Sequence, residues 1–261
     1  MLYDSHCHLH DARVGAAAEA QLERAREAGV ERLLLAGVDP AGWDDAFALR
    51  ARFPLLRVAL GVHPQAIAAD VDGASGMVDA LARALDGGLP RPAAIGETGL
   101  DGLDENASSL LLQEQLFRRQ IGLAKAHDLP LVLHVLRAHP RALVILHKET
   151  LPTRPGVLHS CSASAELVAG YLQLGFMIAF SGAVANPGAR KLIAAARAVP
   201  LDRLLVETDA PFQTPVQRRP ASNEPAFLVE IIAALAQIRG ESATDVARAT
   251  YDNARRLFDG D

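Results

Sequence analysis

Two histidines near the amino terminus have a spacing that suits metal binding. The apolar run Leu2–Asp4 leads into Asp4-Ser5-His6-Cys7-His8. Because side chains alternate along a strand, His6 and His8 share one face and Cys7 points to the other. Two imidazoles on one face at the end of a strand can grip a metal ion. On its own, the pair is equally well explained as two polar residues at a strand end.

Further ionisable residues follow other short apolar runs. They are Glu97 after Ala93–Gly96, His134 after Leu131–Leu133, His159 after Gly156–Leu158, and Asp209 close behind Leu204–Val206. Such side chains are costly to bury unless they are paired or bound to metal. If the runs are parallel barrel strands, their carboxyl ends meet at one mouth and bring these residues together with His6 and His8.

The combined set of histidines and carboxylates suits two divalent metal ions. Oxygen ligands favour Mg²⁺ or Mn²⁺, whereas imidazoles favour Zn²⁺. A glutamate such as Glu97 can bridge two metals roughly 3.5–4 Å apart, which together activate a water and hold the attacking and leaving oxygens. Asp209 could hold one metal and accept the proton of that water, so Asp209 and Glu97 are the expected catalytic carboxylates.

Short apolar runs alternate with helical patterns along the whole chain, and these elements must position the site. The runs, rich in Val, Leu and Ile, predict buried parallel strands at Leu2–Asp4, Arg32–Val38, Arg57–Val62, Ala93–Gly96, Leu131–Leu133, Gly156–Leu158, Phe176–Phe180 and Leu204–Val206. Helices are expected at Ala16–Ala28, Trp43–Arg52, Met77–Ala84, Leu110–Ala126, Arg141–Lys148, Ala165–Leu174, Ala189–Ala198, Pro225–Arg239 and Ala243–Phe258. This order predicts an α/β fold, a single (β/α)8 TIM barrel over residues 1–261 with an extra C-terminal helix. An open doubly wound sheet is the alternative, but the first turn has no glycine-rich nucleotide loop.

Composition narrows the functional classes. The chain has 261 residues, 50% of them hydrophobic, with a formal net charge of −5. It lacks the basic excess of proteins that hold nucleic acid by charge alone. No apolar run is long enough to span a membrane, and the amino terminus does not resemble a signal peptide. Two cysteines argue against a disulfide framework, so a cytoplasmic protein is expected.

Several motifs together resemble the TatD-related deoxyribonucleases of the amidohydrolase superfamily. The matching segments are Asp4-Ser5-His6-Cys7-His8, Gly61-Val62-His63-Pro64, Gly96-Glu97-Thr98-Gly99-Leu100-Asp101, Leu133-His134, Gly156-Val157-Leu158-His159, Phe180-Ser181-Gly182 and Glu207-Thr208-Asp209-Ala210-Pro211. The resemblance runs through nearly the whole chain and implies a TIM barrel with metal-dependent phosphodiester hydrolysis. It also implies that one metal is held by His6, His8, Glu97 and Asp209, and the other by Glu97, His134 and His159.

The sequence departs from the family pattern at positions near the substrate. Leu136 stands where the family usually has an arginine, with Arg137 beside it, and Cys161-Ser162-Ala163 replaces an aromatic-Ser-Gly segment. In the loop after the last strand, Arg219-Pro220 replaces a common Arg-Gly pair. The metal ligands are therefore expected to be complete and the contacts to substrate phosphate to be altered.

Weaker signals give the remaining candidates. His63, Arg137 and Arg219 are the expected substrate-binding residues. Glu207 has the strand parity of Asp209, and Asp4 that of His6, so each is expected to accept a hydrogen bond from a ligand histidine. The other histidines are expected at surface or helix positions; they are His10, His127, His139 and His147.

Three functions remain open at this point. The first is a 3′–5′ exonuclease that acts on DNA ends or another small phosphodiester, as a monomer without membrane association. The second is a hydrolase of a cyclic amide, lactone or other small ester on the same scaffold. Many such relatives carry a carboxylated lysine where this chain has Glu97, which favours the nuclease. The third, a binding protein on a retained barrel, would have no need of six metal ligands.

Overall fold

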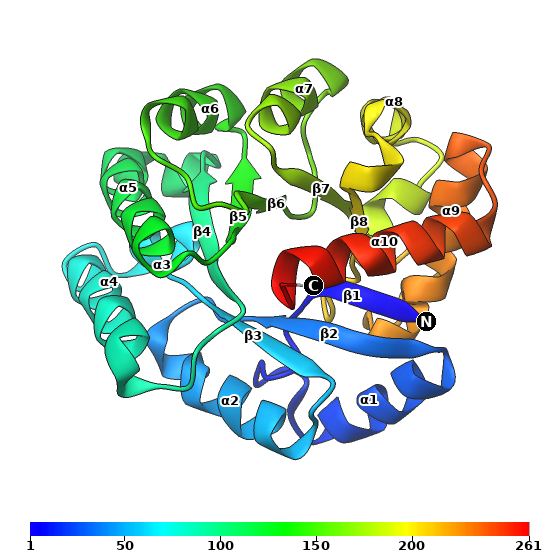
Figure 1. Cartoon of the computed structure of the whole chain (residues 1–261), viewed down its shortest axis with the longest axis horizontal. Helices are drawn as coiled ribbons and strands as arrows, with labels where there is room; N and C mark the ends of the chain where they lie inside the picture. Colours follow the sequence, from blue (N-terminus) through cyan, green and yellow to red (C-terminus); the bar gives the residue numbers. More distant parts are fainter. Residues whose placement is uncertain (261) are drawn as a thin grey trace.

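Eight parallel strands form one sheet in the order of the sequence in the computed structural model, with helices around it (Figure 1). The structure describes residues 1–260. The strands are β1 (Leu2–Cys7), β2 (Val30–Ala36), β3 (Leu56–Leu60), β4 (Ala94–Asp101), β5 (Leu131–Leu136), β6 (Gly156–Leu158), β7 (Met177–Phe180) and β8 (Leu204–Val206). The helices are α1 (Ala18–Glu27), α2 (Trp43–Arg52), α3 (Pro64–Ala69), α4 (Ala74–Arg83), α5 (Leu110–His127), α6 (His139–Lys148), α7 (Ala165–Gln173), α8 (Arg190–Ala198), α9 (Leu228–Arg239) and α10 (Ala243–Phe258). The predicted barrel with an extra C-terminal helix is confirmed.

The seam between β1 and β8 closes the barrel through residues near the predicted site. The Asp209 amide donates to the His6 carbonyl at 2.9 Å, and the His8 amide donates to the Ala210 carbonyl at 2.7 Å. The Ser5 hydroxyl adds a bond to the Val206 carbonyl at 3.0 Å. The backbone around the end of β1 is thus joined to the segment that follows β8 at the mouth.

Helix α10 covers the amino-terminal end of the barrel, where Figure 1 shows it lying across the strands. Its Tyr251, Ala254, Leu257 and Phe258 join one buried cluster with side chains from inside the barrel, including Tyr3. Ser242 caps the start of the helix, where its hydroxyl accepts a hydrogen bond from the Asp245 amide. A barrel left open at this end would expose apolar interior surface, which explains the extra helix.

Strand β4 is longer than predicted and carries Glu97 in its middle rather than after its end. Gly99 makes this possible: its φ is +140°, and a Cβ there would lie 2.1 Å from the His134 carbonyl oxygen of β5. Glycine alone tolerates that approach and that backbone conformation. The two strands that carry Glu97 and His134 can therefore pair closely.

Helix α3 was not predicted. Its first residue is Pro64, and the ring of His63 accepts a hydrogen bond from the Gln65 amide at the start of the helix. Proline suits the first turn of a helix because its missing N–H has no partner there anyway. With six residues, the helix is too short to show an apolar periodicity.

Membrane association is a separate question. None of the helices among residues 1–260 combines the length and the apolar character that a membrane span requires.

The packing of α10 predicts a large stability loss on truncation of its buried face. Leu257 is 3% exposed, so Leu257→Ala should lower the free energy of unfolding by about 2–5 kcal/mol, through lost burial and the cavity left behind. Urea denaturation measures the change. Val229→Ala on α9, at a position 44% exposed, is the control and should change it by less than about 0.5 kcal/mol. Equal losses of unfolding free energy in the two variants would show that packing of Leu257 on α10 does not stabilise the core.

Candidate metal centre

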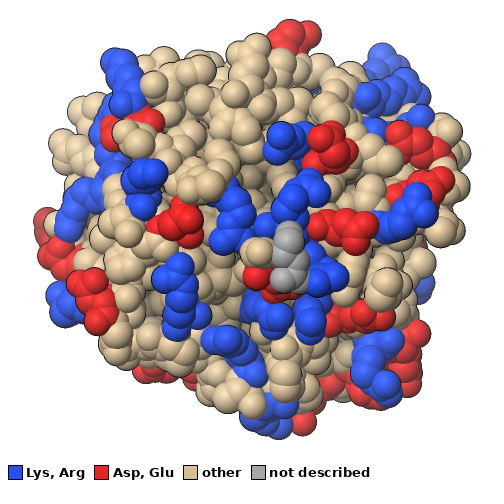
Figure 2. Space-filling view, viewed as in Figure 1, with Lys and Arg blue, Asp and Glu red and all other residues tan. Residues whose placement is uncertain are grey.

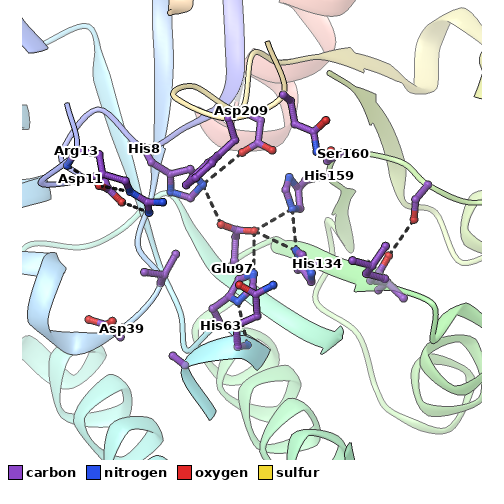
Figure 3. A pocket seen from close by; sticks show the side chains of 18 residues that line it. His8, Asp11, Arg13, Asp39, His63, Glu97, His134, His159, Ser160 and Asp209 are labelled. Atoms are coloured by element: carbon purple, nitrogen blue, oxygen red, sulfur yellow. Dashed lines mark hydrogen bonds and ion pairs between the residues drawn. The ribbon is translucent and has the colours of Figure 1, made fainter. Parts of the chain in front are cut away.

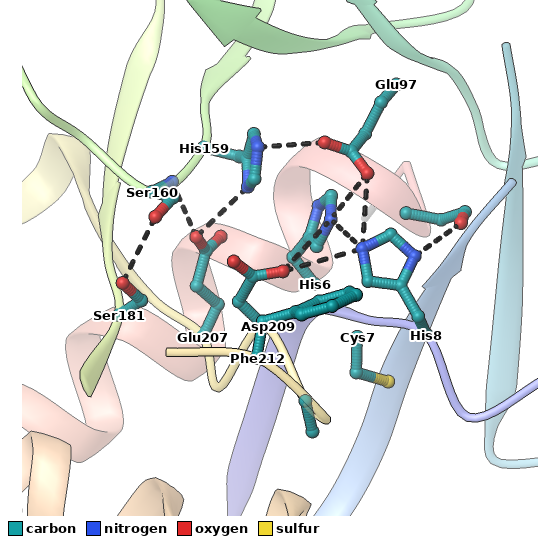
Figure 4. Close-up of polar contacts among 12 residues, drawn as sticks. His6, Cys7, His8, Glu97, His159, Ser160, Ser181, Glu207, Asp209 and Phe212 are labelled. Carbon is teal, nitrogen blue, oxygen red and sulfur yellow. Dashed lines mark hydrogen bonds and ion pairs between the residues drawn. The ribbon is translucent and has the colours of Figure 1, made fainter. Parts of the chain in front are cut away.

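One oxygen of Glu97 faces the histidine pair at the end of β1 (Figure 4). Its Oε1 lies 3.2 Å from the Nε2 atoms of both His6 and His8, and these nitrogens are 3.2 Å apart. Asp209 completes the group, with its Oδ1 3.4 Å from His8 Nε2 and 3.9 Å from His6 Nε2. Asp209 has a φ of +59°, in the left-handed region that aspartate tolerates better than most residues.

The other oxygen of Glu97 faces His134 in β5 and His159 directly after β6 (Figure 3). Its Oε2 lies 2.9 Å from His159 Nε2 and 3.6 Å from His134 Nδ1, and these two nitrogens are 3.3 Å apart. His63 approaches the same oxygen, with its Nε2 at 3.5 Å. Glu97 therefore stands between two separate groups of imidazoles.

The spacing within each group fits coordination of a common ion. Ligand atoms about 2.0–2.1 Å from one metal lie roughly 3.0–3.4 Å from each other in octahedral or tetrahedral geometry. The donor distances above cluster around that range. Imidazole nitrogens this close to each other also need a cation or a proton between them, because two lone pairs repel. The donor chemistry and the geometry thus both fit divalent metals, with His6, His8, Glu97 and Asp209 able to hold one and Glu97, His134 and His159 another.

Three of these imidazoles meet an oxygen on the side away from Glu97. The partners are the Ala36 carbonyl for His8 Nδ1 at 3.0 Å, the Glu207 carboxylate for His159 Nδ1 at 3.3 Å and the Asp101 carboxylate for His134 Nε2 at 3.5 Å. An acceptor on the far side favours a proton there and leaves the near nitrogen with its lone pair directed at the site.

Glu207 lies where the sequence predicted, beside a histidine of the site, and its Oε1 also accepts from the Ser160 amide at 2.6 Å. Asp4 differs from the expectation that it would contact a histidine ring. Its carboxylate accepts from the Thr208 hydroxyl, from the Thr208 amide at 2.9 Å and from the His6 amide at 3.3 Å. The reason is a register shift in β1 between Asp4 and Cys7, which breaks the simple alternation. Asp4 therefore ties the backbone of β1 to the segment after β8.

The charges of the site are mutually dependent. Burial pushes the pKa of Glu97 upward, but the charges of His159 and His6 hold it well below its ordinary range. Burial lowers the pKa of His8, and its contacts to Asp209 and Glu97 outweigh this and raise that pKa to about 10. The carboxylates are thus ionised, and without a metal the compensating positive charge comes from His8, His134 and His159, whose pKa values are raised by contacts to these carboxylates and their neighbours. Metal binding should release those protons.

His63 differs from the other imidazoles of the site. Its Nδ1 accepts a hydrogen bond from the Gln65 amide at 3.0 Å, so in the neutral ring the proton lies on Nε2, which faces Glu97. Burial and the nearby charge of His134 lower its pKa to about 4. At neutral pH, His63 is therefore an uncharged N–H donor directed into the site.

The site opens into a cavity of about 590 Å³ whose arginine was not predicted. Arg13 lines the cavity and forms a bidentate ion pair with Asp11 (Figure 3). Its guanidinium carbon lies 4.4 Å from the centre of the Phe212 ring. Arg137 and Arg219, the predicted phosphate contacts, are not among the lining residues. Arg137 extends toward Asp104 at 4.0 Å, and Arg219 donates to the Thr214 carbonyl of its own loop.

Other residues that shape the site were also missed. Asp101 lies in the Gly96–Asp101 motif and has the same strand parity as Glu97. Because the apolar run predicts a strand that ends at Gly96, Asp101 was not expected at the site. Its carboxylate accepts from the Gln65 side chain at 2.7 Å as well as facing His134. Asn223 is buried and donates to the carbonyls of Thr208 and Phe212, which folds the long loop after β8 back over the strand.

Comparison with known proteins agrees with this geometry. Residues 3–259 match the family model described as TatD related DNase. The chain belongs to this family. It is 32% identical over 259 residues to the uncharacterized metal-dependent hydrolase YabD of Bacillus subtilis (strain 168), covering 99% of each chain. It is 34% identical over 263 residues to the 3′-5′ ssDNA/RNA exonuclease TatD of Dickeya dadantii (strain 3937), covering 98% of this chain and 97% of that protein.

A solved structure supports the same assignment. The TatD homologue YJJV of Escherichia coli K12 superposes with a TM-score of 0.92 at 31% identity, over 99% of this chain and 98% of that one. The family match and the histidine–carboxylate clusters at the mouth together identify the protein as a metal-dependent hydrolase of the TatD family.

His139, expected at the surface or in a helix, begins α6 but is buried. Its ring nitrogens lie 3.1 Å from the Tyr171 hydroxyl and 3.1 Å from the Ser162 hydroxyl. Burial, with the charges of Lys191 and His134, lowers its pKa from 6.5 to about 4. As the pH falls below 6.5, His139 therefore becomes protonated in the unfolded chain, whereas in the folded protein it stays neutral until the pH approaches about 4.

This shift predicts that the free energy of unfolding decreases as the pH is lowered from about 6.5 to about 4. His139 accounts for part of that decrease. His139→Gln should make the fall shallower by up to about 1 kcal/mol per pH unit, since it removes one titrating group. Urea denaturation of metal-free protein across that window measures the slope. The exposed His147→Gln on the same helix is the control and should keep the wild-type slope. A wild-type slope for His139→Gln would contradict the assignment.

Proposed function

We propose that the protein is a 3′–5′ exonuclease that hydrolyses single-stranded DNA with two divalent metal ions at this centre. The observation that carries the proposal is the position of Glu97, with Oε1 3.2 Å from His6 and His8 and Oε2 2.9 Å from His159. A carboxylate shared in this way suits a bridge between two metals. Mg²⁺, Mn²⁺ and Zn²⁺ are all compatible with the mixed nitrogen and oxygen donors.

When bound, two such ions would neutralise phosphate charge and lower the pKa of a water. His6, His8, Glu97 and Asp209 would hold one ion, and Glu97, His134 and His159 the other. Asp209 is the candidate proton acceptor. It is ionised because, although burial raises its pKa, the hydrogen bond from His8 and the charges of His159 and His6 lower it. Its carboxylate lines the cavity and can take a proton from the attacking water.

Neutral His63 and Arg13 are the candidate substrate contacts. The Nε2–H of His63 faces the cavity and can donate to a phosphate oxygen without adding charge. Arg13 lies across the cavity at the loop after β1, where its guanidinium can pair with a phosphate. Phe212, which is 38% exposed beside it, offers a face on which a base can stack.

The dimensions and charge of the protein favour a strand end over a duplex. A cavity of about 590 Å³ accommodates about one to two nucleotides, since ligand pockets of roughly 300–1,000 Å³ hold small molecules. A formal charge of −5 does not suit a long electrostatic track along DNA. The Dickeya dadantii relative is named a 3′-5′ ssDNA/RNA exonuclease, which supports the same polarity.

Cleavage polarity tests the proposal directly. With Mg²⁺ or Mn²⁺, a single-stranded oligonucleotide should lose a 3′ label first and a 5′ label last, and EDTA should stop the reaction. Asp209→Asn should lower turnover by at least about a thousandfold, because it removes a metal ligand and the proton acceptor. Asp202→Asn is the matched control and should keep full activity, because this side chain is 73% exposed and does not line the cavity.

Two results would oppose the proposal. Loss of the 5′ label first would reverse the polarity. Absence of cleavage with every metal, together with turnover of a lactone or cyclic amide, would assign the centre to another bond.

A further inference from the structure

We propose that the amino-terminal end of the barrel holds a second site, which binds a small anion carrying two or more phosphate groups. A cavity of about 570 Å³ lies there, at the starts of β2, β3 and β4 and the end of α10. Four arginines line it: Arg32, Arg50, Arg57 and Arg91. Figure 2 shows basic side chains gathered over the centre of this face, around the end of α10.

Positive charge in this cavity, which we call the arginine pocket, exceeds what the lining neutralises. Among the lining residues that the structure describes, Asp259 is the one carboxylate. Its Oδ1 accepts from Arg57 Nε at 2.6 Å, while its Oδ2 is 3.8 Å from Arg32 Nε, beyond hydrogen-bond distance. Within residues 1–260, neither Arg50 nor Arg91 pairs with a carboxylate. Within the described part of the chain, one carboxylate thus faces four guanidinium groups, and two of the four have no acidic partner.

One guanidinium group also has unsatisfied hydrogen-bonding capacity. The Nε atom of Arg32 is buried and, within the described residues, donates no hydrogen bond. A buried donor without an acceptor carries a desolvation penalty that an anion would remove. Arg91 is partly fixed, since one of its terminal nitrogens donates to the His127 carbonyl at 2.8 Å, and Arg50 lies over the Phe47 ring. The fork-shaped donors are thus held near the cavity before any ligand arrives.

The ligand class follows from charge, shape and volume. Guanidinium groups match phosphate oxygens in bidentate geometry, and several like charges at one cavity repel each other until an anion binds. The cavity volume is in the range of small-molecule sites and exceeds the need of a single phosphate. Apolar walls from Val58, Pro92 and Phe258 strengthen the attraction by lowering the local dielectric constant. A compact anion with two or more phosphates satisfies all three conditions.

The arginine pocket is independent of the metal centre. It lies at the starts of the strands, whereas Glu97 and Asp209 line the cavity at the opposite mouth. Between them is the buried interior of the barrel, which includes Leu34, Ala59 and Leu205. A test of the pocket therefore succeeds or fails separately from a test of the proposed nuclease.

Isothermal titration with inorganic pyrophosphate tests this site, using the full-length protein freed of metal with EDTA, because a loaded metal centre would also bind pyrophosphate. We expect one pyrophosphate per chain, with the same affinity in the wild type and in Asp209→Asn. The double variant Arg32→Gln, Arg50→Gln should weaken the affinity by at least about tenfold, because two charged donors are lost. The double variant Arg26→Gln, Arg83→Gln removes two exposed arginines that do not line the pocket, so it is the charge-matched control and should leave the affinity unchanged.

A variant of opposite sign guards against loss of folding as the explanation. Asp259→Asn should tighten pyrophosphate binding by about threefold or more, because it removes the carboxylate that competes for Arg57 and Arg32. Absence of saturable binding to the wild type would overturn the proposal. So would binding that is unaffected by the double arginine variant, or binding that disappears in Asp209→Asn.

Discussion

The division of the Glu97 carboxylate between two groups of imidazoles is the constraint on which the rest of the site depends. One oxygen meets His6 and His8 at the end of β1, and the other meets His134 in β5 and His159 at the end of β6. A buried carboxylate is costly unless such partners surround it. The partners come from strands far apart in the sequence, so only a closed barrel brings them to one carboxylate.

Two features of the barrel hold Glu97 and its partners in place: the seam that joins β1 to the segment after β8, and helix α10 over the amino-terminal end. Hydrogen bonds between the backbones of His6 and Asp209, and of His8 and Ala210, join the first strand to the segment after the last. Helix α10 fills the opposite end, so buried apolar side chains occupy the interior beneath the site. Rigid elements on both sides hold the donor atoms at the spacing that a metal ion requires.

Much of this arrangement could be predicted from the sequence, because buried parallel strands give short apolar runs and a polar residue after such a run is conspicuous. The fold and the convergence of His6, Glu97 and Asp209 follow from that pattern. The predictions that were wrong or missing have physical causes. The register shift in β1 redirected Asp4 from a ring to the backbone, and the extension of β4 past Gly99 concealed Asp101. Loop conformation decides whether an arginine reaches the cavity, and apolar periodicity carries no information on it.

Anomalous diffraction from crystals soaked in Mn²⁺ tests the role of Glu97 most directly. The account predicts two peaks about 3.5–4 Å apart, one in contact with each oxygen of Glu97. The first should also contact His6, His8 and Asp209, and the second His134 and His159. A single peak, or two peaks that leave Glu97 uncoordinated, would contradict it.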